Sequence, residues 1–323
     1  MRFFPFPSCI MIVAVAGFAH LDANAQDAEQ TLNLIEGWNA VHLRVTPDGT
    51  VASVFDGAPV ELVTTWYPEK LKVSSLQDPA AEPWKNSEWR TWQAPGLPGA
   101  FLNNLHAMES GRAYLIKARA AATIRLRGTP SADRLHWEAQ SFNFTGLPAD
   151  PASPATFAAF FAGSAAHQPL RAFRMAAGNW QPVSANSTIN PSEAYWIWCG
   201  EGSEFQGPLD VRVGENPILN SSSESFPIKL VSNSGSPMAV QVTATGSLPL
   251  AGISRQRSAN ATPVTLGSNP AVFSATAGEA QDYRISWAAA ATPAVPGSSS
   301  VLQFRAAGVR LTVPVSFLAS PAR

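Results

Sequence analysis

The residue types that most often carry metal or acid–base chemistry are scattered along this chain. Beyond the first 25 residues its histidines are His42, His106, His136 and His167, and none is spaced as a ligand pair or sits beside a second strong ligand. The sequence contains no Gly-x-Ser-x-Gly, no phosphate-binding glycine loop and no calcium loop of alternating acidic and amide side chains. We therefore predict no metal and no cofactor, with structural or surface roles for the histidines.

Catalysis by other side chains is the least favoured function class. Cys199 is the only cysteine after residue 25, so residues 26–323 cannot form an internal disulfide. A small buried apolar filler is the favoured role for Cys199, with a catalytic thiol as the alternative. Two acids could meet in space as a glycosidase pair, but their spacing does not indicate it. These isolated acids are Glu36, Glu61, Glu88, Glu109 and Glu138.

Aromatic residues of the first half offer the clearest binding chemistry. Flat aromatic faces on an exported protein can stack on sugar rings, and nearby polar side chains could hydrogen-bond the hydroxyls. The alternative is that these tryptophans belong to the core, as the later Trp180 suggests for Trp89. The predicted sugar platform consists of Trp66, Trp84, Trp89 and Trp92, next to Tyr67, Asn86, Glu88 and Gln93.

The charge of the chain argues against nucleic acid and anionic membranes as partners, and its distribution raises a hypothesis about docking. Charged residues are only 14% of the chain and the formal net charge is −1, so no global field would attract nucleic acid or an anionic membrane. Residues 110–132 contain five bases and no acid, whereas residues 175–211 contain acids and no base. Solvated strand faces explain both stretches, and docking of one half on the other, or of one molecule on the next, is the sharper alternative.

Residues 1–25 have the pattern of a secretory signal peptide. Arg2 supplies the positive start, residues 10–19 form an apolar run, and Ala23-Asn24-Ala25 fits a small-x-small cleavage site. The apolar run is shorter than the roughly 20 residues of a membrane span. We expect an exported chain that is periplasmic, cell-surface or extracellular, with no membrane span after cleavage.

The rest of the first 210 residues reads as one unit made twice. Thr50 and Gly57 bracket a short apolar helical pattern, and Thr156 and Gly163 bracket a second one. Each is followed later by a similar strand, Ala113-Tyr114-Leu115-Ile116 and then Ala194-Tyr195-Trp196-Ile197. A sheet of about five strands closed by one helix is the smallest arrangement that hides both apolar surfaces.

These motifs resemble a known module. Gly37-Trp38-Asn39-Ala40-Val41 and the closing Gly111-Arg112-Ala113-Tyr114-Leu115-Ile116, followed by Gly128, are similar to a module of large secreted and surface-exposed bacterial proteins. There it often precedes Ig-like, cadherin-like or lectin-like domains. The resemblance covers about residues 31–209, and in the second copy Ser141-Phe142 replaces the Gly-Trp pair. It implies location and neighbouring domains, and no particular activity.

The last part of the chain has the alternation of a half-buried antiparallel sandwich. It resembles Ig-like domains whose final strand ends in Val-Pro-Val, here Val313-Pro314-Val315. We therefore predict a mainly β fold with two homologous small β-rich modules, each with one short helix, followed by an Ig-like antiparallel β-sandwich. The predicted bounds are a signal peptide at 1–25, module copies at 26–130 and 131–214, a linker at 215–225 and the sandwich at 226–323.

The function expected from these observations is that of a non-catalytic exported structural or adhesive protein of the cell surface or extracellular matrix. The alternative is a carbohydrate-binding protein that uses the tryptophans of the first copy. Expected partners are a polysaccharide or protein of the cell envelope or the extracellular space, and not nucleic acid.

Overall fold

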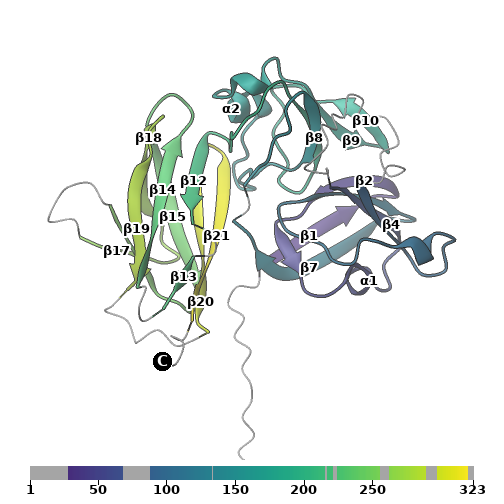
Figure 1. Cartoon of the computed structure of the whole chain (residues 1–323), viewed down its shortest axis with the longest axis horizontal. Coiled ribbons are helices and arrows are strands. Elements are labelled where there is room, and N and C mark those ends of the chain that lie inside the picture. Colours follow the sequence, from purple (N-terminus) through teal and green to yellow (C-terminus); the bar gives the residue numbers. More distant parts are fainter. Residues whose placement is uncertain are drawn as a thin grey trace, which may run out of the picture.

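Short runs of alternating apolar residues fold this chain into antiparallel sheets joined by turns. Two small β modules lie side by side, and a β-sandwich lies next to them (Figure 1). The prediction of a mainly β fold, with a short helix in each module and an Ig-like sandwich, is confirmed. The predicted signal peptide, residues 1–25, lies outside the described residues. The computed structural model describes residues 28–67, 88–132, 134–214, 217–220, 224–254, 262–288 and 297–318.

Module one (residues 26–130) contains two sheets instead of the expected single sheet of about five strands. One has the strand order β2-β6-β4-β5 and the other the order β1-β7-β3. The second sheet forms because β1 pairs with β7 along its whole length, which brings Leu32, Leu34 and Leu126 into the core. The elements are β1 (Ala28–Leu34), β2 (Gly37–His42), β3 (Val45–Pro47), α1 (Val51–Val54), β4 (Val60–Trp66), β5 (Trp89–Gln93), the 3-10 turn η2 (Ala100–Leu102), β6 (Ala113–Ala118) and β7 (Ala122–Pro130).

Module two (residues 131–214) repeats the first of these sheets. Its strand order is β8-β11-β9-β10, which matches β2-β6-β4-β5 strand for strand. Trp180 lies opposite Met175 across β10 and β9, just as Trp89 lies opposite Trp66 across β5 and β4. The elements are β8 (Ser141–Thr145), α2 (Phe157–Phe161), η3 (Ala165–His167), β9 (Ala172–Ala176), β10 (Asn179–Pro182) and β11 (Tyr195–Cys199).

Both α-helices begin at the threonine that the sequence indicates. The Thr50 hydroxyl accepts a hydrogen bond from the Ser53 amide (3.2 Å), and the Thr156 hydroxyl accepts one from the Ala159 amide (3.1 Å). Each bond satisfies an amide that lacks a partner within the helix. Helices this short are held by packing more than by propensity, and the buried residues that anchor them are Val51 in α1 and Phe157, Phe160 and Phe161 in α2.

Two buried tyrosines occupy corresponding positions in the modules. The Tyr114 hydroxyl accepts a hydrogen bond from the Glu109 amide (2.8 Å), and the Tyr195 hydroxyl accepts one from the Asn190 amide (2.9 Å). In both cases the amide belongs to the residue five positions earlier, in the loop that enters the strand. Each tyrosine therefore fastens this loop to the core beneath its sheet.

Two asparagines make a second matching contact. Asn39 exchanges two hydrogen bonds with the backbone of Ile35, both of 2.9 Å. Asn143 does the same with Glu138, at 2.7 and 3.1 Å. Each asparagine closes the turn before the first strand of the repeated sheet, as Asn side chains commonly do in turns.

The sandwich has two layers around one large apolar core. One layer has the strand order β13-β21-β20-β15-β18 and the other the order β12-β14-β19-β16-β17, and a short parallel pairing of β18 with the end of β14 joins them into one continuous ten-stranded sheet. The strands are β12 (Leu209–Val213), β13 (Ile218–Leu219), β14 (Ser225–Ser232), β15 (Met238–Gly246), β16 (Leu250–Ser254), β17 (Val264–Leu266), β18 (Ala271–Ala277), β19 (Gln281–Trp287), β20 (Ser299–Ala306) and β21 (Val309–Phe317).

Strand pairing crosses the predicted boundary between module two and the sandwich. β12 falls inside the range 131–214, but it pairs antiparallel with β14 of the sandwich from Leu209 to Val213. β13 falls inside the predicted linker 215–225 and pairs parallel with the end of β21. The chain thus enters the sandwich before its polar, serine-rich stretch.

The turn between β20 and β21 reaches into module two. The Gly308 carbonyl accepts hydrogen bonds from the amides of Asp150 (2.9 Å) and Ala155 (3.2 Å), and Val309 is buried within the module-two core. Gly308 has φ of +73° and a Cβ there would lie 2.5 Å from the Ala155 nitrogen. Only glycine suits this close approach, so the sandwich and module two are fastened together.

We predict that Tyr114→Phe and Tyr195→Phe lower the free energy of unfolding by similar amounts, about 1–2 kcal/mol each, because each leaves one amide without its partner. Urea unfolding followed by circular dichroism measures the loss. Tyr67→Phe is the matched control, because among the described residues the Tyr67 hydroxyl hydrogen-bonds only the exposed Glu109 carboxylate, at 3.3 Å. A neutral result for one of the two core variants would contradict the correspondence.

Candidate functional site

Two of the four tryptophans of the predicted sugar platform, Trp89 and Trp92, are buried and cannot stack on a sugar. Trp89 and Trp92 are 4% and 7% exposed and project from opposite faces of β5. Trp92 packs in the core of module one, with its ring 6.1 Å from that of Phe55. Trp66 is half-buried and donates its Nε1–H to Glu88 (3.2 Å). Trp84 and Asn86 lie outside the described residues.

The outer faces of the two repeated sheets pack against each other. Trp196 lies fully buried between them, with its ring 6.0 Å from Trp66 and 6.3 Å from Trp89 of module one. On its own side it packs against Phe144 (4.8 Å) and Trp180 (6.2 Å). These tilted and edge-on contacts are the favoured geometries for aromatic pairs. We call this cluster the aromatic interface.

Backbone hydrogen bonds also join the modules. The Ala194 amide donates to the Ala40 carbonyl (3.1 Å), and the His42 amide donates to the Ser192 carbonyl (3.0 Å). By contrast, the oppositely charged stretches pair inside their own modules: Lys117 with Glu61 (3.1 Å) and Arg174 with Glu193 (3.7 Å). The modules are therefore joined by apolar packing and main-chain bonds, and these ion pairs do not join them.

Residues singled out for catalysis have structural surroundings. Cys199 is buried in the core of module two, as expected of a filler, and burial raises the pKa of its thiol. Within the described ranges no three His, Cys, Asp or Glu side chains gather to hold a metal ion. Four of the five isolated acids bind nearby groups: Glu61 pairs with Lys117, Glu88 accepts from Trp66, Glu109 pairs with Arg112, and Glu138 pairs with His136.

A wide cleft runs along the modules and the sandwich, with a volume of about 1120 Å³. The Tyr67 ring lines this cleft and contacts two guanidinium groups, with Arg112 3.8 Å and Arg90 4.8 Å from its ring centre. Glu109 accepts hydrogen bonds from both Arg112 (2.5 Å) and Tyr67 (3.3 Å). The charged groups here already have partners, which is typical of a structural network.

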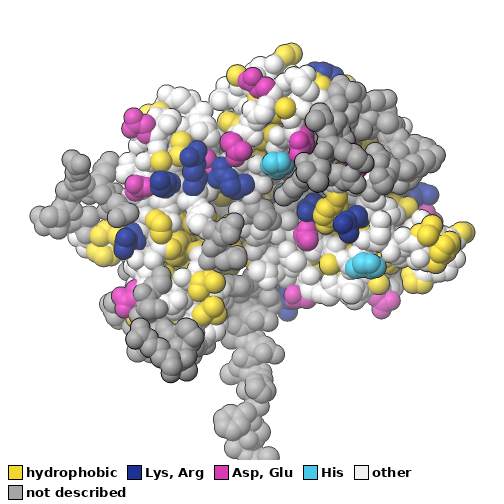
Figure 2. Space-filling model, viewed as in Figure 1, with side chains coloured by type: hydrophobic (Ala, Val, Ile, Leu, Met, Phe, Trp, Pro, Cys, Tyr) yellow, Lys and Arg dark blue, Asp and Glu magenta, His cyan; other side chains and the backbone are white. Residues whose placement is uncertain are grey.

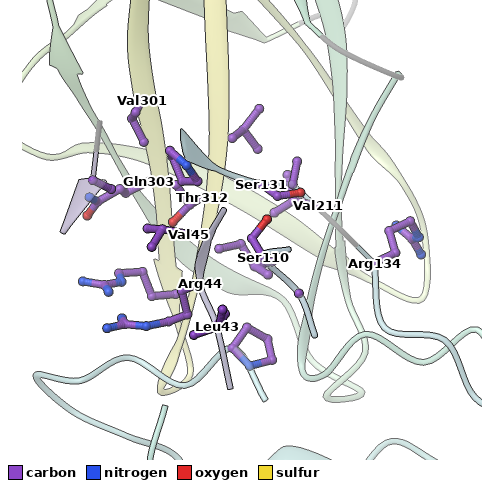
Figure 3. A pocket seen from close by; sticks show the side chains of 18 of the residues that line it. Leu43, Arg44, Val45, Ser110, Ser131, Arg134, Val211, Val301, Gln303 and Thr312 are labelled. Atoms are coloured by element: carbon purple, nitrogen blue, oxygen red, sulfur yellow. The ribbon is translucent and has the colours of Figure 1, made fainter. Parts of the chain in front are cut away.

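A smaller cavity of about 540 Å³ lies where both modules meet the sandwich. Figure 3 shows side chains from all three bodies around it, with Arg44 and Gln303 on one side and Arg134 on the other. Its volume is in the range of small-ligand sites. Apolar residues supply much of the lining, among them Leu43, Val45, Leu135, Val211, Val301, Leu311 and Val313.

Arginines gather at the Arg44 side of this cavity. Arg310 also lines it, and Arg305 lies directly opposite Arg310 across β20 and β21. Burial, and then the charge of Arg310, lowers the pKa of Arg44 to about 10. Burial and the charge of Arg305 lower the pKa of Arg310. On the far side, Arg134 pairs with the buried Asp210 at 2.8 Å.

His42 lies beside this cavity and closes the contact between the modules. It is 7% exposed and packs so tightly on Gly146 that an added Cβ there would lie 2.0 Å from its ring. Burial lowers the pKa of His42 to about 4, although a hydrogen bond with the Pro191 backbone opposes the shift. His167 is fully buried in module two, hydrogen-bonded to Ser164 (2.7 Å), and burial lowers its pKa to about 4 as well.

The cavity arginines were not among the residues predicted from the sequence. Arg305 and Arg310 lie on either side of Ala307-Gly308, a turn signal between two alternating strands. Their pairing could therefore be predicted from the local sequence. Arg44 joins them from more than 250 positions away along the chain, and no local pattern indicates that contact.

An exposed apolar tip lies on module one. Phe101 and Leu102 in η2 are 82% and 70% exposed, and hydrophobic side chains gather at that end of the molecule in Figure 2. No helix among the described residues is long and apolar enough to cross a membrane.

Comparison with known proteins finds only distant similarity to parts of a few solved structures. No family model and no curated protein matches the chain. Among solved structures, the N-terminal domain of PorA is similar at 16% identity, covering 35% of this chain and 97% of that one, with a TM-score of 0.22. A FixG-related protein from Vibrio parahaemolyticus (9% identity; 35% and 95% covered; TM-score 0.21) and PapD-like domain 7 of human CEP192 (10% identity; 36% and 87% covered; TM-score 0.20) are comparable.

We predict that Trp196→Ala lowers the free energy of unfolding by about 3–5 kcal/mol, because it opens a cavity inside the aromatic interface. Trp196→Phe should lose less than half as much. It keeps most ring contacts and removes a buried indole N–H that lacks a partner among the described residues. Calorimetric unfolding measures both, with Phe101→Ala, which truncates an exposed aromatic ring outside the interface, as control. Equal stability of wild type and Trp196→Ala would contradict a packed interface.

We also predict that stability falls as the pH drops below neutrality. A histidine with a folded pKa of about 4 and an ordinary unfolded value of 6.5 binds its proton first in the unfolded chain. The stability from His42 and His167 is complete above pH 6.5 and is lost as the pH falls through 4, by on the order of 3 kcal/mol each.

The measurement is urea unfolding at several pH values between 4 and 7. His42→Gln and His167→Asn should each flatten the slope over this interval, with the exposed His106→Gln as control. An unchanged slope in both core variants would show that other groups cause the acid sensitivity.

Proposed function

We propose that this chain is a non-catalytic, exported structural or adhesive protein built from two copies of one β module and an Ig-like sandwich. The observation that supports it most is the aromatic interface. The large aromatic surface that could have bound a ligand is used instead to hold the protein's own parts in fixed positions. A protein that keeps its parts rigidly aligned is suited to spacing or anchoring at a surface.

Common origin of the modules is part of this proposal. Identical strand order, matching threonine caps, and matching tyrosine and asparagine contacts all support one ancestral unit. Their outer sheet faces then meet in an arrangement where corresponding strands contribute on both sides. Such self-complementary contact is how two copies of one surface commonly associate.

Export is supported by the sequence of residues 1–25. Suitable partners are a polysaccharide or a protein of the cell envelope or extracellular space. The carbohydrate alternative has less support, because Trp89 and Trp92, two of its four tryptophans, are buried on opposite faces of one strand.

Cell fractionation tests the proposal. The full chain, tagged after residue 323, should be degraded by protease added to intact cells or to cells with a permeabilised outer layer, and should sediment with isolated envelopes. A variant lacking residues 2–25 should remain in the cytoplasm and serves as the control. Recovery of the full chain in the cytoplasm together with this variant would contradict the proposal.

A further inference from the structure

The arginine cluster at the cavity between the two modules and the sandwich carries more positive than negative charge. Arg305 and Arg310 occupy directly opposed positions on β20 and β21, and Arg44 reaches the same place from module one. Like charges directly opposite on paired strands are destabilising. The chain carries only 22 basic residues and a net charge of −1, so three crowded arginines are not a by-product of a basic surface.

No acid neutralises Arg44 or Arg310 in an ion pair within the described part of the chain. The two acids that line the cavity already have partners: Glu29 pairs with Arg127 (2.8 Å) and Asp210 with Arg134 (2.8 Å). Asp150 is near enough to Arg310 for its charge to favour the charged form of Arg310, but it makes no ion pair with Arg310, and one acid does not balance three arginines.

Two donors of this cluster are buried without a partner. The Nε atom of Arg44, which lines the cavity, is buried and makes no hydrogen bond within the part of the chain that the structure describes; the same is true of Arg305, which lies opposite Arg310 and does not itself line the cavity. A buried donor left unsatisfied is costly, and such groups in a native fold call for an explanation. A guanidinium group presents Nε and Nη donors in a fork that fits a carboxylate with two parallel bonds.

The remainder of the cavity indicates what kind of molecule would carry the carboxylate that these arginines can bind. Away from the arginines, aliphatic residues such as Val45 and Val211 share the walls with polar side chains such as Ser110 and Ser131 (Figure 3). The aliphatic part of the lining suits an aliphatic chain or an aliphatic peptide end.

We propose that this cavity binds a ligand with a carboxylate head and an aliphatic body, the head held by Arg44 and Arg310. A peptide C-terminus and a medium-chain fatty acid share this chemistry. The site needs all three bodies of the fold, and it does not depend on export.

Isothermal titration calorimetry on the purified protein tests the site with two separate probes. One is N-acetyl-leucyl-leucine, which has a free carboxylate, and the other is octanoate. We expect saturable binding of at least one, and the one that binds more tightly identifies the source. The amide of the same dipeptide should bind about 10-fold or more weakly, because it lacks the charge. Arg44→Gln and Arg310→Gln should weaken binding by a similar factor, and Arg310→Lys should retain part of it.

Arg125→Gln is the matched control, because it removes one positive charge from an exposed position on β7 and leaves the cavity intact. A second measurement separates binding from a structural role. Without ligand, Arg44→Gln and Arg310→Gln should unfold at the same temperature as the wild type or higher, because each relieves repulsion. A purely structural cluster would be destabilised.

The proposal is overturned if neither probe binds, if the amide binds as well as the acid, or if Arg125→Gln weakens binding as much as Arg310→Gln. It is also overturned if inorganic sulfate displaces the probes at equal concentration, which would indicate a counter-ion site. A chain that is exported yet binds neither probe refutes this site alone. A cytoplasmic chain that binds them refutes the proposed function alone.

Discussion

Burial of two aromatic sheet faces against each other is the constraint on which the rest of this structure depends. Each repeated sheet is apolar on both sides: the inner face covers a helix and a small core, and the outer face carries large rings such as Trp89 and Trp196. A sheet of this kind must be covered on both faces to be stable in water. Neither module can expose its outer face, so each serves as the cover for the other.

The junction cavity is a consequence of this packing. The aromatic interface aligns the modules, and the turn at Gly308 fastens the sandwich to module two. Arg44 of module one is thereby brought beside Arg310 of the sandwich. Crowded positive charge persists in a fold only when the surrounding structure is rigid enough to hold it, and such stored strain commonly marks functional sites.

Local features of this fold were predictable from the sequence, and contacts between distant segments were not. The caps at Thr50 and Thr156 and the alternation around Tyr114 and Tyr195 follow from short patterns with a direct physical reading. Whether Trp89 is buried could not be predicted, because both faces of β5 carry a tryptophan and the alternating pattern does not indicate which face is exposed to solvent. The pairing of β12 with the sandwich and the contact of Arg44 with Arg310 depend on how the modules and the sandwich pack together. No local sequence pattern predicts that packing.

Hydroxyl-radical footprinting with mass spectrometry tests the central claim most directly, because it reports the solvent exposure of individual aromatic side chains in the intact protein. The account predicts that Trp89 and Trp196 are protected as strongly as Trp137 in the core of module two, while Phe101 is oxidised rapidly. Oxidation of Trp89 and Trp196 at the rate of Phe101 would mean that the two modules do not cover each other, and the account would be contradicted.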